Sequence, residues 1–144
     1  MVSTVAVGTD GSGTAGKAVR AAVDLAERYR ARIVFLSVYH PKSSIGLGGA
    51  MTEAPDEIQW SINPEEEVDK ILSEAEQLAE ERGLRWASEA QLGEPAEVLV
   101  RLADKYDADV LVIGNRGMHR RVLGSVPNSV THTANCTVFL VKTS

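Results

Sequence analysis

The sequence predicts one α/β domain over residues 1–144: a doubly wound, five-stranded parallel sheet in the order 3-2-1-4-5, with helices on both faces. Three observations favour this fold. Short apolar runs alternate with segments of helical periodicity, which is typical of parallel sheets with right-handed crossovers. The 144 residues are enough for one buried core, and no internal repeat or domain linker is apparent. Five strands in a domain of this size favour the flavodoxin-like arrangement with the first strand in the centre.

The expected strands are five apolar runs, at 2–8, 32–39, 84–92, 109–114 and 137–142. Four of these runs are nearly continuous in Val, Ile, Leu and Phe, as in strands that are covered on both faces. The run 84–92 is more mixed in polarity, so we expect it to lie at an edge of the sheet.

Helices are expected between these strands. The first, over 14–30, carries an apolar stripe of Ala18, Ala22, Leu25, Ala26 and Tyr29. The second runs over 64–82 and ends at Gly83. The third starts at Glu94-Pro95, and the fourth runs from about Ser125 to Ala134 with Pro127 in its first turn. The third is expected to bury Val98, Leu99, Leu102 and Tyr106.

The bulk composition argues against several classes of protein. The net charge is −5, so the surface as a whole repels polyphosphate backbones and we expect no nucleic-acid partner. No apolar run approaches the length of a bilayer span, and we see no secretion signal, so we expect no membrane association. The single Cys136 excludes an internal disulfide, is expected to be a small buried thiol, and fits a cytoplasmic protein.

The predicted strand order places a topological switch point between the first and fourth strands. Ligands of such folds bind beyond the carboxyl ends of the strands at this point. The two loops that meet there are GTDGSG, at 8–13, and GNRGMHRRVLGS, at 114–125. A long connection over 40–63 leaves the second strand, and segments of this kind act as lids, act as interaction segments or remain disordered.

The segment 11–17 imitates two phosphate-binding motifs. It reads G-x-G-x-x-G, but no acidic residue occurs over 28–52, where a dinucleotide site needs one for the ribose. It also reads as a P-loop, but Ala18 stands where a magnesium-binding hydroxyl is required. We therefore reject both motifs. Asp10 either caps the first helix or accepts a hydrogen bond from a ligand hydroxyl, and it is our candidate ligand for Mg²⁺.

A second glycine cluster, over 112–130, carries the stronger signal. Gly114 and Gly117 allow the backbone to approach a ligand closely. Gly124-Ser125 leads into the last helix, whose free amides and dipole favour a phosphate. Three arginines lie between these glycine turns, so we favour anion binding over a merely solvated loop: Arg116, Arg120 and Arg121.

These segments resemble the universal stress protein family, and the resemblance covers nearly the whole chain. It is carried by VAVGTDGS at 5–12, by DVLVIGNRG at 109–117 with the following LGSV, and by CTVFLVK at 136–142. Nucleotide-binding members of the family carry G-x-x-G, a spacer, and then G-S or G-T. The positions that match are Gly114, Gly117, Gly124 and Ser125.

The resemblance implies a site for an adenine nucleotide: ATP, AMP or cyclic AMP. Asp10 matches an acidic residue that contacts the nucleoside, and Val38 matches a position whose backbone reads adenine. The predicted nucleotide-binding set is completed by residues of the same segments: Gly8, Thr9, Ile113, Arg116 and Val126. The resemblance also implies a homodimer that pairs the C-terminal strands, 137–142, which the predicted order already leaves as an exposed sheet edge.

One departure from the family pattern concerns the spacer. It runs from Met118 to Leu123, which makes it three residues shorter than usual. A shorter loop supplies fewer amides around a polyphosphate tail, so we hypothesise that AMP or cyclic AMP fits at least as well as ATP.

Three functions are compatible with these patterns. We favour a stress or regulatory protein that senses or sequesters an adenine nucleotide, because no Ser-His-Asp spacing, paired carboxylates or metal cluster is apparent in the sequence. The enzymatic alternative is slow ATP hydrolysis or phosphoryl transfer with Asp10 and Mg²⁺. The third is a dimeric interaction module with a vestigial pocket.

Overall fold

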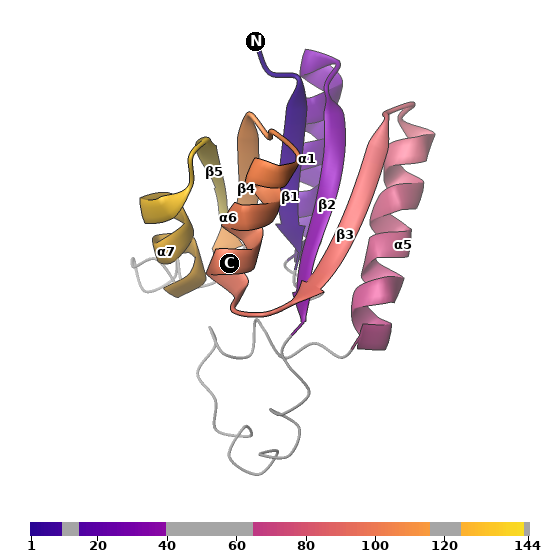
Figure 1. Ribbon diagram of the computed structural model, residues 1–144. Helices are drawn as coiled ribbons and strands as arrows, with labels where there is room; N and C mark the ends of the chain where they lie inside the picture. Colours follow the sequence, from indigo (N-terminus) through magenta and orange to yellow (C-terminus); the bar gives the residue numbers. More distant parts are fainter. Residues whose placement is uncertain (10–14, 40–64, 116–124, 143–144) are drawn as a thin grey trace.

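A five-stranded parallel sheet forms the centre of the structure, in the order β3-β2-β1-β4-β5 (Figure 1). This computed structural model describes residues 1–9, 15–39, 65–115 and 125–142. The predicted strand order is confirmed, with parallel pairing between all neighbouring strands. The elements, in chain order, are β1 (Thr4–Thr9), α1 (Ala15–Tyr29), β2 (Arg32–Tyr39), α5 (Glu65–Glu81), β3 (Trp86–Leu92), α6 (Pro95–Lys105), β4 (Val110–Asn115), α7 (Ser125–Thr133) and β5 (Thr137–Lys142).

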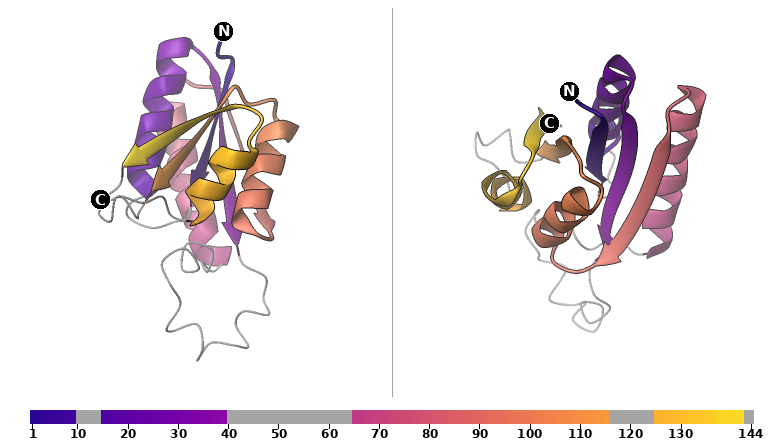
Figure 2. Two further views of the ribbon diagram at one scale, coloured as in Figure 1. Left: turned by 90° about the vertical axis from the view of Figure 1, so that its left-hand side faces the viewer. Right: turned by 45° about the horizontal axis from the view of Figure 1, so that its top comes forward.

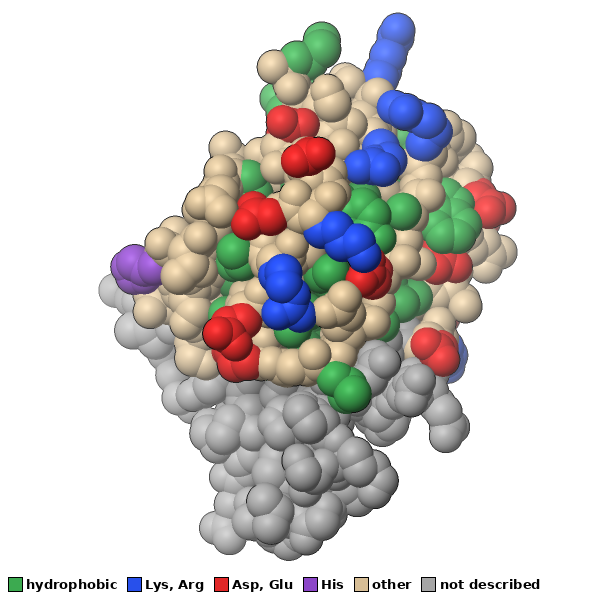
Figure 3. Space-filling view, in the orientation of Figure 1, with side chains coloured by type: hydrophobic (Ala, Val, Ile, Leu, Met, Phe, Trp, Pro, Cys, Tyr) green, Lys and Arg blue, Asp and Glu red, His purple; other side chains and the backbone are tan. Residues whose placement is uncertain are grey.

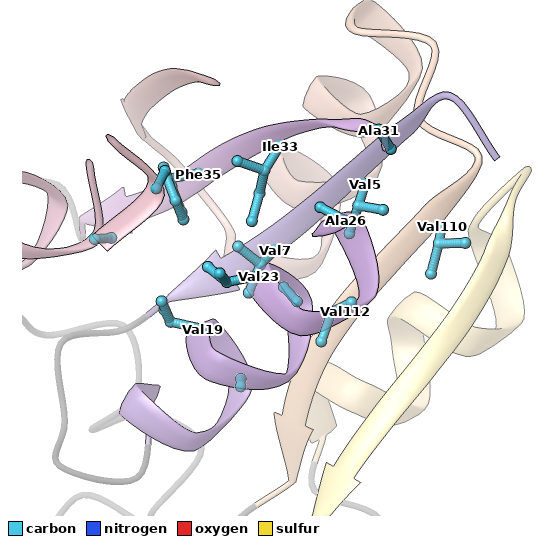
Figure 4. Close-up of a cluster of buried hydrophobic side chains, with 14 of the residues drawn as sticks. Val5, Val7, Val19, Val23, Ala26, Ala31, Ile33, Phe35, Val110 and Val112 are labelled. Carbon is cyan, nitrogen blue, oxygen red and sulfur yellow. The ribbon is translucent and has the colours of Figure 1, made fainter. Parts of the chain in front are cut away.

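Helices cover both faces of the sheet. Helices α1 and α5 lie on one face, and α6 and α7 lie on the other (Figure 2). Successive strand residues point to opposite faces, so β1 directs Val5 and Val7 toward α1 and Ala6 toward α6. The core on the α1 side also includes Phe35 and Val112 (Figure 4). The expectation of strands covered on both faces is thus confirmed for the centre of the sheet.

Two burial predictions at the margins of this core are wrong. Tyr29 is 48% exposed, because the buried stripe of α1 is rotated toward Val19 and Val23 and leaves the last residue of the helix at its edge. Strand β5 is not covered on both faces: Phe139 is 44% and Leu140 is 37% exposed. The cause is its place at the end of the sheet, where only β4 lies beside it.

Cys136, just before β5, also departs from expectation. It is half-buried rather than fully buried. Partial desolvation still raises the pKa of its thiol, which favours the neutral form. The side chain therefore behaves as a small apolar residue at the edge of the core.

Three helices end in the same type of turn, with one residue in the left-handed region. The α5 turn uses Gly83 (φ 71°), as predicted, whereas the α1 turn uses Arg30 (φ 56°) and the α6 turn uses Asp107 (φ 54°). In the α1 turn the N–H of Ala31 donates to the carbonyl of Ala26 at 2.8 Å. A side chain in this region costs about 1 kcal/mol relative to glycine. Arg30 is therefore an energetically unfavourable choice for its position.

Helix α6 begins where the sequence predicts. Its N-cap is Glu94, whose carboxylate accepts a hydrogen bond from the Glu97 N–H at 2.8 Å, and Pro95 occupies the first turn. Val98, Leu99 and Leu102 are buried as expected, whereas Tyr106, after the end of the helix, is only half-buried. The N-terminus of α6 is thus closed by a carboxylate of the chain itself.

The C-terminal end of α6 is joined to the edge strand β3 by hydrogen bonds to Glu89. Its Oε1 accepts hydrogen bonds from Lys105 Nζ at 2.8 Å and from the Tyr106 hydroxyl at 2.6 Å. Its Oε2 accepts from Gln91 Nε2 at 2.6 Å. The hydrogen bonds from Lys105 and Tyr106 lower the pKa of Glu89 from 4.5 to about 2.

This network makes the stability pH-dependent. Because the pKa of Glu89 is lower in the folded chain, its contribution is complete above pH 4.5 and is lost as pH falls toward 2. We expect Glu89→Gln to reduce the free energy of unfolding at pH 7 by about 2 kcal/mol, and by much less at pH 2. Urea titrations at both pH values measure this, with exposed Glu80→Gln as the control. An equal loss at both pH values would contradict the assignment.

Candidate functional site

The pairing of the two central strands β1 and β4 stops short of their carboxyl ends, and we call the region beyond the last pair the crevice. The pairing of these strands runs from Val5–Val110 to Val7–Val112 and ends there, although both strands continue. Pairing with the outer neighbours persists, because Thr9 still pairs with Ser37 of β2. On the other side, β4 remains paired with β5 to its last residue. The strands therefore separate at the predicted switch point.

Predicted site residues occupy the borders of this crevice. Gly8 and Thr9 form the end of β1, and Ile113 and Gly114 lie near the end of β4. Val38 lies one residue before the end of β2. Ser125, which is exposed, and Val126, which is buried, begin α7.

Several of these residues meet on the α6–α7 face of the sheet. The side chains of Val38, Ile113 and Val126 are buried in one cluster with Leu99 of α6. They form an apolar floor below the carboxyl ends of the strands. Because these side chains are buried, a ligand at the carboxyl ends of the strands would contact the backbone groups of these residues.

Other predicted site residues are not in the described part of the chain. Asp10, Arg116, Gly117 and Gly124 lie outside the described residues, as does the long connection 40–63. Their predicted contacts, including Mg²⁺ at Asp10, therefore stay predictions.

Gly8 has an identifiable packing role. A Cβ atom at this position would lie 3.0 and 3.1 Å from the two methyl groups of Leu99, and 3.4 Å from Cγ2 of Ile113. Leu99 is completely buried, so it has little freedom to move away. The missing side chain at Gly8 lets α6 approach the sheet directly beside the crevice.

The two helices on this face differ in the charge at their N-termini. The first turn of α6 contains Glu97, and the Glu94 carboxylate caps it. The first turn of α7 contains no acidic residue, and its last turn contains His132. A helix N-terminus carries a partial positive charge, which attracts an anion when no carboxylate neutralises it. The start of α7 is therefore suited to a phosphate, whereas the start of α6 is already occupied.

Sequence reasoning missed two buried polar side chains near the crevice. Asn115, the last residue of β4, is 0% exposed, and Ser37 of β2 is 1% exposed. A polar residue at the end of a continuous apolar strand is a signal that could have identified Asn115. Buried polar side chains of this kind are as a rule hydrogen-bonded.

Two other kinds of feature are absent from residues 1–9, 15–39, 65–115 and 125–142. No group of three or more His, Cys, Asp or Glu side chains in these ranges could hold a metal ion. No helix in the same ranges has the length and apolar character needed to cross a membrane.

Comparison with known proteins gives a consistent result. The model of the universal stress protein family matches residues 1–142. Universal stress protein Rv1636 of Mycobacterium tuberculosis is 34% identical over 145 residues, covering 98% of this chain and 97% of that protein. Universal stress protein MJ0531 of Methanocaldococcus jannaschii is 31% identical over 144 residues, covering 96% of this chain and 81% of that protein.

Solved structures agree with this result. The crystal structure of a universal stress protein in complex with cAMP has a TM-score of 0.73 and 31% identity, and covers 99% of this chain and 98% of that chain. UspA from Lactobacillus plantarum has a TM-score of 0.74 at 20% identity, which supports the fold alone, and covers 97% of each chain. With the fold, the family model and these relatives in agreement, the chain belongs to the universal stress protein family.

Proposed function

We propose that this protein binds an adenine nucleotide in the crevice between β1 and β4, with the phosphate at the N-terminus of α7. The observation that carries the proposal is the early end of the β1–β4 pairing after Val7 and Val112. Separated strands leave main-chain N–H and C=O groups available to a ligand, and the start of α7 has no acidic residue to repel its phosphate. The 31%-identical relative that was solved with cAMP supports this choice of ligand.

Each proposed contact follows from the resemblance or from the fold. The backbone near Val38 reads adenine, and Asp10 contacts the nucleoside. Thr9, Ile113 and the apolar floor border the base and sugar. The phosphate is held by the glycine motif and the first turn of α7, through Gly114, Arg116, Gly117, Gly124, Ser125 and Val126.

The proposed site fits a compact ligand, AMP or cyclic AMP, at least as well as ATP, because the spacer from Met118 to Leu123 is short. The proposed role is to sense or sequester this nucleotide in the cytoplasm. Hydrolysis of ATP is not part of the proposal, and release of phosphate from ATP by purified protein would favour the enzymatic alternative.

Calorimetry with AMP, cyclic AMP, ATP and adenosine tests the proposal. We expect Ser125→Asp to weaken AMP binding about tenfold or more, because a carboxylate at the start of α7 repels the phosphate. Binding of adenosine should change far less. Ser129→Asp, at an exposed position one turn later on the same helix, is the matched control.

Three results would contradict the proposal. If Ser125→Asp weakened the binding of AMP and of adenosine equally, the phosphate would not lie at the start of α7. Binding of ATP much more tightly than AMP or cyclic AMP would refute the compact ligand. No heat and no thermal stabilisation with any of the nucleotides would favour a vestigial pocket.

A homodimer through β5 is the second part of the proposal. The two edges of the sheet differ in chemistry. Strand β3 carries Glu89 and Gln91, which are tied by hydrogen bonds, and charged groups of this kind oppose edge-to-edge pairing. Strand β5 instead exposes Phe139 and Leu140. An apolar, exposed edge strand is suited to pairing with a second copy.

A further inference from the structure

Arginines gather at the end of the sheet opposite the crevice. Two turns lie side by side there, the turn from α1 to β2 and the turn from α5 to β3, because Ile33 pairs with Trp86. Their sequences contribute five of the fifteen Lys and Arg residues of a chain with net charge −5: Arg28, Arg30, Arg32, Arg82 and Arg85. Basic side chains cluster at the upper right of Figure 3, where these turns lie.

Two of these arginines serve the fold. Arg82 forms ion pairs with Asp24 at 3.2 Å and Glu27 at 2.9 Å, which join α5 to α1. Arg32 is half-buried, donates to the carbonyl of Tyr106 at 3.1 Å, and lies over the Tyr106 ring. Both guanidinium groups are therefore held in place by the chain itself.

The other three, Arg28, Arg30 and Arg85, are exposed, and their side chains make no hydrogen bond or ion pair with the described residues. Arg85, directly before β3, lies beside Arg32 of β2, since the Ile33 N–H donates to the Arg85 carbonyl at 2.9 Å. Tyr29, between Arg28 and Arg30, is 48% exposed. Arginine with tyrosine is the composition that dominates protein–protein hot spots. We call Arg28, Tyr29, Arg30 and Arg85 the basic edge.

The backbone at Arg30 gives an independent reason to assign a role to this surface. Arg30 has φ 56°, a conformation that favours glycine, and the equivalent turn of α5 uses Gly83. The Arg30 side chain makes no hydrogen bond or ion pair with the described residues. Unfavourable backbone conformations that persist in a fold point to a function of the side chain.

We propose that the basic edge binds an acidic segment of a partner protein. Guanidinium groups pair with carboxylates in a bidentate manner, and the ring of Tyr29 offers apolar contact to the stems of the acidic side chains. A nucleic acid fits less well, because Glu27, Glu80 and Glu81 lie nearby in the chain and the protein as a whole is acidic. The surface is at the opposite end of the sheet from the crevice, so it is separate from the proposed nucleotide site.

Fluorescence anisotropy with a labelled peptide of ten glutamates tests the proposal, with a peptide of ten glutamines and a ten-nucleotide uridine RNA for comparison. Replacing Arg28, Arg30 and Arg85 together by Gln should weaken glutamate-peptide binding about tenfold or more. The matched control replaces Arg20, Lys70 and Arg101 by Gln, which changes the net charge equally at exposed positions elsewhere. The control variant should bind nearly as the unmodified protein does.

Arg30→Gly supplies a second readout that a purely structural role would not produce. It should raise the melting temperature by about 2–4 °C, since glycine relieves the left-handed backbone, while it weakens peptide binding. A lower melting temperature, or unchanged peptide binding, would overturn the role of Arg30. Equal losses in the two triple variants, no binding of the glutamate peptide, or tighter binding of the RNA would overturn the proposed partner.

Discussion

A Leu99→Ala variant is expected to lose about 3–4 kcal/mol of unfolding free energy. Leu99 is 0% exposed in the cluster that joins α6 to the sheet, so the truncation leaves a cavity that this packing cannot close. Urea denaturation measures the effect. Leu78→Ala on α5 is the control. Leu78 is only partly buried, so its truncation should lower the unfolding free energy much less.

The close approach of Leu99 to Gly8 makes this prediction sharper. Gly8→Ala alone should be destabilising by about 1–3 kcal/mol, because its Cβ would meet the Leu99 methyl groups at 3.0 and 3.1 Å. In a Leu99→Ala background those methyl groups are gone, so Gly8→Ala should be nearly neutral. The double-mutant cycle therefore yields a coupling energy of about 1 kcal/mol or more. Additive effects of the two substitutions would contradict this packing role of Gly8.

A Leu140→Asp variant is expected to convert the proposed dimer into a monomer. Leu140 is 37% exposed on β5, and pairing with a second copy along this strand would bury it. A carboxylate buried there without a partner should weaken association about 100-fold. Sedimentation over a concentration series measures the shift from twice the chain mass of 15.5 kDa to the mass of one chain.

Leu92→Asp is the matched control for this experiment. Leu92 is also an exposed leucine, at 52%, but it ends β3, on the opposite edge of the sheet. Its replacement should leave the mass unchanged. Dissociation of both variants would mean that the interface involves more than β5, and a monomeric unmodified protein would refute the dimer.

Local patterns were sufficient to predict most of the architecture. The apolar runs 32–39 and 137–142 coincide with strands Arg32–Tyr39 and Thr137–Lys142, because continuous β-branched and aromatic residues specify extended backbone. The start of α6 was equally predictable, since Glu94-Pro95 combines a cap with a residue suited to the first turn. The switch point then followed from the strand order.

The features that escaped prediction depend on distant partners. The predicted stripe of α1 was misplaced by part of a turn, so Tyr29 was expected in the core, and only the sheet beneath decides which side of α1 is covered. The packing of Gly8 depends on Leu99, which is far away in the sequence. The low pKa of Glu89 requires Lys105 and Tyr106, which α6 brings back to β3. No local pattern encodes such contacts.

The polar edge at β3 has a consequence for how far assembly can proceed. Two copies joined through β5 would form one continuous sheet, and each outer end of that sheet would be a β3 strand. Strand β3, with its polar residues Glu89 and Gln91, would then form both ends of the sheet and discourage the addition of further copies. Assembly would stop at two subunits. The β5 edge of each chain would form the dimer, and the β3 edge would prevent the chains from joining into fibres.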